Sequence, residues 1–195
     1  MTFSKHILAL TAIAATFAAG SAMAADGTIS FTGKITSASC SITGGSGANV
    51  SGDKTVSVNL GTVSSDSIPD PTSTSIAAAT SINLNLNCGN TAEGLTTVKV
   101  KFDPISGSGV DASNNMLLQV TGGAEGVGIG LYDKANKLLN LAANETFDAP
   151  LVKGGTETAP VYTAALNMRA GYVKNGATFK SGNANGTLPF TLTYE

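Results

Sequence analysis

The stretch that decides the fold is Ser81-Ile82-Asn83-Leu84-Asn85-Leu86-Asn87-Cys88, in which apolar and polar residues alternate strictly. Because successive side chains of a β-strand point to opposite faces, this pattern puts Ile82, Leu84 and Leu86 on one face. The same alternation recurs along most of the chain, at residues 29–35, 56–60, 98–102, 118–120, 127–131, 161–172 and 188–194. The sequence therefore predicts an all-β protein.

Clusters of small and polar residues separate these predicted strands, at residues 44–53, 64–74, 89–94, 106–115 and 175–185. Gly, Asn, Ser and Asp in such clusters are typical of turns. Strands at this spacing, with no break in composition between them, predict one domain built as an antiparallel sandwich or barrel. Residues 134–141 are the one helix candidate outside the N-terminus, and they fit a hairpin turn equally well.

The spacing of the glycines at positions 126, 128 and 130 is similar to that of a phosphate-binding loop. Such a loop needs a strand before the glycines and a helix that opens directly after them. Here the glycines alternate with Val127 and Ile129 and lead into Leu131, which favours a strand through the glycines themselves.

The first 24 residues have the three parts of a secretory signal peptide. Lys5 and His6 precede an apolar run at residues 7–19, which is shorter than the about 20 residues that a membrane span needs. Ala22-Met23-Ala24 matches a signal peptidase site, so we expect cleavage after Ala24 and a mature chain of 171 residues. A retained N-terminal anchor is the alternative.

Removal of this segment would take away the only histidine of the chain, His6. A mature chain without histidine cannot form a Ser-His-Asp or Cys-His catalytic unit or a His-containing zinc site. Its acidic residues show neither the spacing of a calcium loop nor a pairing that points to a glycosidase. We therefore expect that the protein is not an enzyme, binds no cofactor, and has no catalytic or metal-binding residues.

The charge and cysteine content favour an exported, inert protein. After cleavage, 10 of the 11 basic residues would remain beside all 13 acidic residues, and this net charge of −3 argues against a nucleic-acid partner. Cys40 and Cys88 both lie in the expected mature part, and export favours a disulfide between them. A catalytic thiol is the alternative, but it would lack a histidine partner.

Both ends of the expected mature chain carry strongly alternating strands. Residues 27–35 read Gly-Thr-Ile-Ser-Phe-Thr-Gly-Lys-Ile and are followed by Cys40, while Tyr194 is penultimate and Gly182 is the fourteenth residue counted back from Glu195. With residues 53–61, 82–88 and 127–133, this ordered set resembles the chaperone–usher fimbrial subunits, most closely the major pilins of type 1-like fimbriae. The resemblance covers residues 25–195.

This resemblance implies an all-β fold, an incomplete immunoglobulin-like antiparallel sandwich that a donor strand from another subunit completes. In this family the donor adds to an open sheet edge, a known case of β-strand addition. Residues 1–24 would be the signal peptide, 25–38 an N-terminal donor-strand extension and 39–195 the pilin domain. The implied donor residues are Ile29, Phe31, Gly33 and Ile35, and the implied residues of the groove edge and chaperone contact are Gly182, Leu188, Phe190, Leu192 and Tyr194.

The function implied by the resemblance is structural. The chain would be a subunit, most simply a major shaft pilin, of a surface fimbria that supports cell adhesion. Its partners would be identical or related pilin subunits, a periplasmic chaperone and an outer-membrane usher. It would pass through the periplasm to the cell surface without stable membrane insertion. A minor or tip adhesin that binds a host glycan or protein is the alternative, and a small exported hydrolase is disfavoured by the missing histidine.

Two features depart from the family pattern. Residues 44–53 form a longer and more glycine-rich connection than the family has between its first two strands. Pro189 lies inside the last predicted strand, where it has no N–H for a ladder hydrogen bond. We therefore expect that strand to start with a bulge or to run along a sheet edge.

Overall fold

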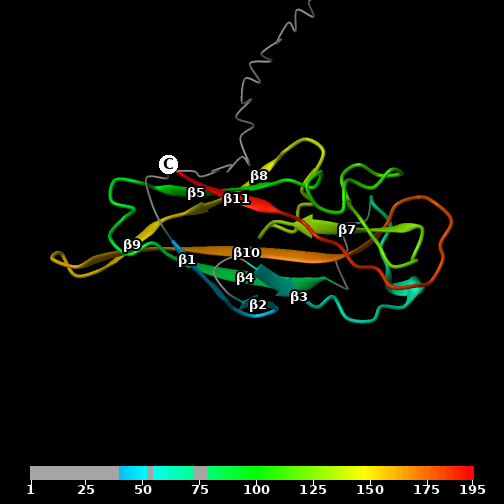
Figure 1. The fold of residues 1–195 in the computed structure, drawn as a ribbon, viewed down its shortest axis with the longest axis horizontal. Coiled ribbons are helices and arrows are strands. Elements are labelled where there is room, and N and C mark those ends of the chain that lie inside the picture. The colour runs from blue at the N-terminus through cyan, green and yellow to red at the C-terminus, as the bar shows by residue number, and fades with distance from the viewer. Residues whose placement is uncertain (1–39, 52–54, 73–78) are drawn as a thin grey trace, which may run out of the picture. The chain divides into compact units, whose positions relative to one another are not determined.

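The computed structural model describes residues 40–51, 55–72 and 79–195, which form antiparallel β-structure (Figure 1). The only helical element of these residues is a short 3-10 turn, η1 (Ser65–Ser67). The strands are β1 (Ser41–Gly44), β2 (Ala48–Ser51), β3 (Thr55–Val58), β4 (Thr80–Asn87), β5 (Thr97–Phe102), β6 (Leu118–Gln119), β7 (Val127–Tyr132), β8 (Thr146–Pro150), β9 (Val152–Gly155), β10 (Pro160–Lys174) and β11 (Phe190–Tyr194). The all-β prediction is confirmed.

The strands form two larger sheets and a hairpin. One sheet has the order β1-β4-β10-β7-β6, with β9 also paired to β10, and the second has the order β11-β5-β8. Strands β2 and β3 pair only with each other. Strands β8 and β9 follow one another directly but pair in different sheets, and between them the Leu151 N–H donates to the Thr96 carbonyl at 2.8 Å. The chain therefore crosses from one sheet to the other at Leu151.

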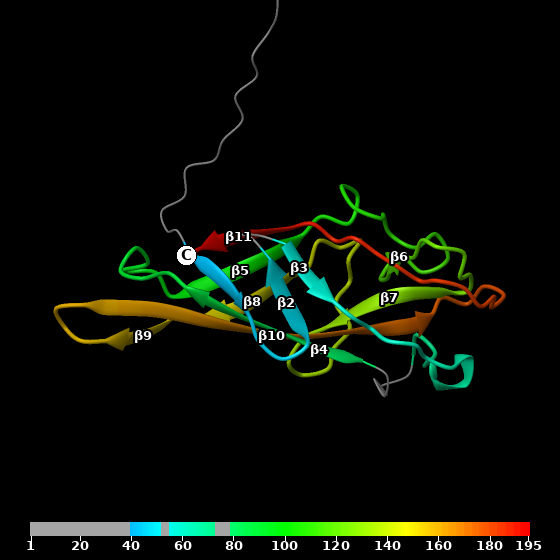
Figure 2. The same ribbon diagram turned by 60° about the horizontal axis from the view of Figure 1, so that its bottom comes forward.

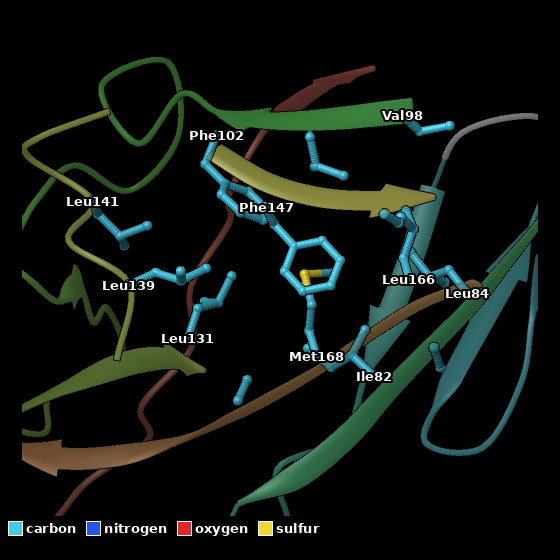
Figure 3. Close-up of a cluster of buried hydrophobic side chains, with 14 of the residues drawn as sticks. Ile82, Leu84, Val98, Phe102, Leu131, Leu139, Leu141, Phe147, Leu166 and Met168 are labelled. Carbon is cyan, nitrogen blue, oxygen red and sulfur yellow. The ribbon is translucent and has the colours of Figure 1, made fainter. Parts of the chain in front are cut away.

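The core lies between the two larger sheets, where the alternating residues meet. Ile82, Leu84 and Leu86 of β4 are buried together with Leu166 and Met168 of β10, as the alternation predicted. The second sheet supplies Val98, Val100, Phe102, Phe147 and Ala149. Figure 3 shows the Phe147 ring reaching from β8 towards Met168 of β10. Side chains from both sheets thus close one continuous apolar layer.

Strand β7 is buried at all six positions, although it has the sequence Val-Gly-Ile-Gly-Leu-Tyr. The glycines are needed because neighbours cover both faces of the strand. A Cβ at Gly128 would lie 2.8 Å from the Leu117 Cβ, and one at Gly130 would lie 2.9 Å from the Leu138 Cδ1. These residues form a central strand, so the phosphate-loop alternative is wrong.

Three regions differ from the sequence-based expectation. Residues 44–53 were expected to be a turn, but they contain β2, which pairs with β3 from Ala48↔Val58 to Ser51↔Thr55. Residues 146–155 contain β8 and β9, which the sequence analysis did not predict, although Thr-Phe-Asp-Ala-Pro of β8 alternates between exposed and buried residues. Residues 134–141 are not a helix, because the Asp133 Oδ1 accepts the backbone N–H groups of Ala135 and Lys137 at 2.8 and 2.9 Å and closes a turn.

Cys40 and Cys88 form a disulfide, as predicted. Cys88 follows β4 directly and is buried, while Cys40 precedes β1. Next to the disulfide, β1 pairs with β4 from Ser41↔Asn87 to Gly44↔Leu84. The bond therefore ties β1, the edge strand of the larger sheet, to its neighbour β4.

Removal of this bond should destabilise the fold, because it closes a loop with a sequence separation of 48 residues. In the chain-entropy account, such a loop is worth roughly 4 kcal/mol. The double variant Cys40→Ala/Cys88→Ala should lose about this much unfolding free energy in urea titrations, and reduction of the native protein should produce the same loss. Unchanged stability in both samples would contradict the prediction.

Candidate functional site

Strand β11 lies at the end of the three-stranded sheet, paired only with β5 (Figure 2). The register runs antiparallel from Phe190↔Phe102 to Tyr194↔Val98. The strand begins directly after Pro189, whose carbonyl accepts the Asp103 N–H at 2.8 Å. Pro189 has no N–H to return this bond to Asp103, so the ladder lacks one hydrogen bond here and β11 begins only after the proline. The strand lies at a sheet edge, which is one of the two arrangements expected.

The hydrogen bonds to β5 use alternate residues of β11. Glu195 and Thr97 exchange both backbone bonds, at 2.8 and 2.9 Å. Because bonded and non-bonded pairs alternate in an antiparallel ladder, Thr191 and Thr193 also bond β5, whereas Phe190, Leu192 and Tyr194 point their backbone groups away from it. In the described part of the chain no strand lies on that side. Three N–H and three C=O groups therefore form an open edge.

The side chains of the same three residues face the core but are only half-buried. They pack against the main apolar cluster, as do Leu188 and three valines of the β2–β3 hairpin, Val50, Val56 and Val58. These side chains of β11 and of the hairpin thus share one apolar cluster with the core. Half-exposed apolar side chains beside unpaired backbone groups are the combination that an added β-strand can cover.

The opposite edge of the same sheet is protected. Since alternate residues of β5 bond β11, those in between bond β8, and this leaves the backbone groups of Thr146, Asp148 and Pro150 at the outer edge. Pro150 has no N–H, and Asp148 carries a charge, so this edge disfavours strand addition. No residue from Phe190 to Tyr194 is charged or a proline. Of the two edges, β11 is therefore the one suited to accept a strand.

Contacts at both ends hold β11 in place. At one end the Glu195 carbonyl accepts the N–H groups of Thr96 and Thr97 at 2.6 and 2.8 Å. The Lys99 Nζ lies 2.6 Å from the Glu195 Oε2, and this hydrogen bond raises the pKa of Lys99. At the other end the Asp103 N–H donates to the carbonyl of Pro189, just before β11. The side chain of the same Asp103 accepts both the hydroxyl and the backbone N–H of Ser106, which lowers the pKa of Asp103.

Tyr194 connects the open edge to the disulfide. Its half-buried ring packs against a small cluster formed by Cys88, Ala92 and Tyr162, next to Cys40. Burial raises the pKa of Tyr194. The penultimate tyrosine that the sequence singled out is therefore an anchor between the two sheets.

The structure brings together four of the five residues expected at the groove edge: Leu188, Phe190, Leu192 and Tyr194. Gly182 lies elsewhere, in a segment that bridges residues 121–125 through Gly123↔Asn183 and Thr121↔Asn185. A Cβ at Gly182 would lie 2.5 Å from the Ala124 N, so glycine permits this close approach. The expected contacts of all five residues with a chaperone stay predictions.

The expected donor residues Ile29, Phe31, Gly33 and Ile35 lie outside the described residues. Sequence reasoning did not assign Val50 to the apolar surface, because it lies in a stretch interpreted as a turn. The alternation in Ala48-Asn49-Val50-Ser51 was the available signal.

Within residues 40–51, 55–72 and 79–195, no three His, Cys, Asp or Glu side chains gather where they could hold a metal ion. The same residues include no helix that is long and apolar enough to cross a membrane.

The family model for fimbrial proteins matches residues 29–195. This chain belongs to the fimbrial protein family. It is 31% identical to the long polar fimbria protein A of Salmonella typhimurium, over 98% of this chain and 97% of that protein. It is 33% identical to the probable major fimbrial subunit LpfA of Escherichia coli O157:H7, with the same shares covered. These relatives are fimbrial subunits, and the chain is accordingly a subunit of surface fimbriae.

Two solved structures share the fold. The P pilus rod subunit PapA is 23% identical with a TM-score of 0.50, over 86% of this chain and 100% of that chain. A subunit from a chaperone–usher pilus, solved in a study of rod uncoiling, is 22% identical with a TM-score of 0.51, over 87% and 95%. The immunoglobulin-like sandwich expected for this fimbrial subunit is thus confirmed as its fold.

The contact between Asp103 and Ser106 predicts a pH dependence of stability. Because the pKa of Asp103 is lowered in the folded state, its carboxylate stabilises the fold above the unfolded value of about 3.9, and this contribution is lost as the pH falls through the lowered value. Asp103→Asn should therefore reduce the melting temperature at neutral pH, and the difference from the native chain should disappear in strong acid.

A matched control is Asp148→Asn, since the Asp148 side chain accepts no hydrogen bond in the described part of the chain. It should show a smaller difference at neutral pH. An Asp103→Asn deficit that stays constant from neutral pH to strong acid would contradict the assignment.

Proposed function

We propose that this fimbrial subunit is a shaft pilin that polymerises by donor-strand exchange, with a periplasmic chaperone and an outer-membrane usher as assembly partners. The observation that carries the proposal is the open edge of β11, where three residues combine unpaired backbone groups with half-buried apolar side chains. The fibre so formed would stand on the cell surface and support adhesion.

The N-terminal segment of another subunit fits the needs of this edge. Ile29, Phe31, Gly33 and Ile35 recur at every second position, as do Phe190, Leu192 and Tyr194. An extended donor can therefore turn all four residues to the core while its backbone pairs with the open N–H and C=O groups. Gly33 supplies a position with no side chain, which suits a shallow place along the acceptor surface.

A temporary partner for the same edge explains the role of a chaperone. A free apolar strand edge promotes unspecific pairing with other chains. Such a partner would cover Phe190, Leu192 and Tyr194 before assembly, and an usher would then allow the donor of the next subunit to replace it. Removal of residues 1–24 on export would place the donor segment 25–38 at the start of the mature chain.

The relatives favour the shaft over the tip. The chain aligns over 98% of its length with a protein named as a probable major fimbrial subunit, and it covers 97% of that protein. PapA, which shares the fold, is described as a rod subunit. Major subunits repeat along the fibre, so each copy must both donate and accept a strand.

Acceptance of the donor is tested by two lysine substitutions on neighbouring residues. Leu192→Lys would place a charge on the half-buried face of β11, whereas Thr193→Lys would place it on the exposed face. A synthetic peptide of residues 25–38 should bind a subunit lacking those residues. Leu192→Lys should weaken this binding at least about 30-fold, since a buried unpaired charge costs several kcal/mol, and Thr193→Lys should change it less than about three-fold.

Calorimetry or fluorescence polarisation gives the affinities, and melting curves confirm that both variants are folded. Equal affinity of the two variants for the peptide would contradict the assignment of β11 as the acceptor strand.

Position in the fibre is tested separately by electron microscopy with an antibody to this subunit. Labelling along whole filaments supports the shaft role, and labelling confined to filament tips supports a tip adhesin instead.

A further inference from the structure

Asp111 is the one charged residue that is buried among the described residues, with 6% of its surface exposed. Its Oδ1 accepts the backbone N–H groups of Ser113 and Asn114, at 2.9 and 3.0 Å. Its Oδ2 accepts the side-chain amide of Asn175 at 2.8 Å, across 64 residues of sequence. The carboxylate thus joins the 111–117 loop to the end of β10.

Both side-chain atoms of Asn175 that can form hydrogen bonds are engaged. The Nδ2 group donates to Asp111, and the Oδ1 accepts the Ala177 N–H at 3.0 Å. The backbone of the same residue is held as well, because its N–H donates to the Gly126 carbonyl at 3.1 Å. Asn175 therefore has a fixed side-chain orientation, although it is only half-buried.

Asn175 is followed by Gly176, and this pair is chemically labile. In an Asn-Gly pair the glycine amide nitrogen can attack the asparagine Cγ, because no side chain hinders the approach. The new N–C bond closes a succinimide ring, the C–Nδ2 bond breaks, and the glycine amide proton leaves with ammonia. Water then opens the ring to aspartate or isoaspartate, and no oxidant or reductant is needed.

We propose that Asn175 is a latent deamidation site that the Asp111 carboxylate keeps unreactive in the folded subunit. Ring closure requires the Asn175 Cγ to turn towards the Gly176 nitrogen, and this movement breaks the hydrogen bonds to Asp111 and Ala177. The bond to Asp111 is charge-assisted and partly buried, so it is the stronger restraint of the two. The Asp111 carboxylate thus slows the deamidation of Asn175 by holding its side-chain amide.

Deamidation would turn this contact from attractive to repulsive. A second carboxylate would lie where the Asn175 amide now donates, within hydrogen-bonding distance of Asp111. Like charges at this distance in a buried place repel strongly. The junction at Asn175 leads through residues 176–189 into β11, so its loosening would reach the segment that carries the acceptor edge.

The chain contains a second Asn-Gly pair, Asn185-Gly186, which serves as an internal control for the deamidation rate at Asn175. The Asn185 backbone is paired with Thr121 in both directions, at 2.8 and 2.9 Å, but no described residue bonds its side chain. Both pairs lie in the same connection before β11. Global unfolding would expose both, whereas loss of the Asp111 contact would free Asn175 alone.

The test is incubation of the native chain, Asp111→Ala and Asp111→Asn in warm, mildly alkaline buffer, followed by peptide mapping with mass spectrometry. The rates of the amide-to-acid mass change at positions 175 and 185 are measured separately. Loss of a charge-assisted hydrogen bond should speed deamidation at position 175 about 10-fold in Asp111→Ala, with position 185 changed less than about two-fold. In Asp111→Asn, which keeps an oxygen acceptor, the deamidation rate at position 175 should lie between those of the native chain and of Asp111→Ala.

The native chain in denaturant supplies the second comparison, which holds even where Asp111→Ala unfolds and both sites accelerate together. Folding should slow position 175 at least about 10-fold relative to the unfolded chain. An equal rate at position 175 in the folded and unfolded native chain overturns the proposal. So does an unchanged rate at position 175 in a variant that melting curves show to be folded.

Discussion

The open backbone groups along one side of β11 are the constraint on which the rest of the structure depends. Phe190, Leu192 and Tyr194 face the core with their side chains and point their N–H and C=O groups away from β5. Within the described residues, nothing completes the ladder on that side. A fold that keeps such an edge must hold it rigidly, since a flexible strand would turn inward or pair at random.

The surrounding contacts supply that rigidity. Glu195 and Pro189 fasten the two ends of β11 to the β5 side, through hydrogen bonds to Thr97 and Asp103. Tyr194 packs near the Cys40–Cys88 disulfide, which also fixes β1 to β4. The other edge of the same sheet is closed to addition by Pro150 and Asp148. Of the two edges of this sheet, one is thus suited to strand addition and the other is protected, which fits the proposed growth of a linear polymer.

The sequence predicted those strands whose residues alternate clearly between apolar and polar, and it missed others. Strands β4, β5, β7, β10 and β11 were predicted from alternation, because burial of every second residue gives alternating apolar and polar residues within one short segment. Strands β2, β8 and β9 were missed for different reasons. Strand β2 lies in a stretch interpreted as a turn, and β9 is half glycine, although each pairs with the strand that follows it. Strand β8 pairs with the distant β5, and no local pattern contains that pairing. Gly182 shows the limit of a spacing argument, since its contact with residues 123 and 124 depends on a fold that brings two loops together.

The site was predictable in composition but not in geometry. The alternation of residues 188–194 identified the side chains that face the core, and Pro189 indicated an edge strand. Which residues expose their backbone groups depends on the register with β5, a long-range property that no local pattern contains. The contrast with the β8 edge likewise required the order of the strands.

Amide hydrogen exchange of β11, followed by NMR or mass spectrometry in the unassembled subunit and in the assembled fibre, tests the central claim most directly. In the unassembled subunit, the N–H groups of Leu192 and Tyr194 should exchange fast, while those of Thr191 and Thr193, bonded to β5, should be protected. In the fibre all four should be protected. Equal protection of all four in the unassembled subunit, or fast exchange of Leu192 and Tyr194 in the fibre, would contradict the account.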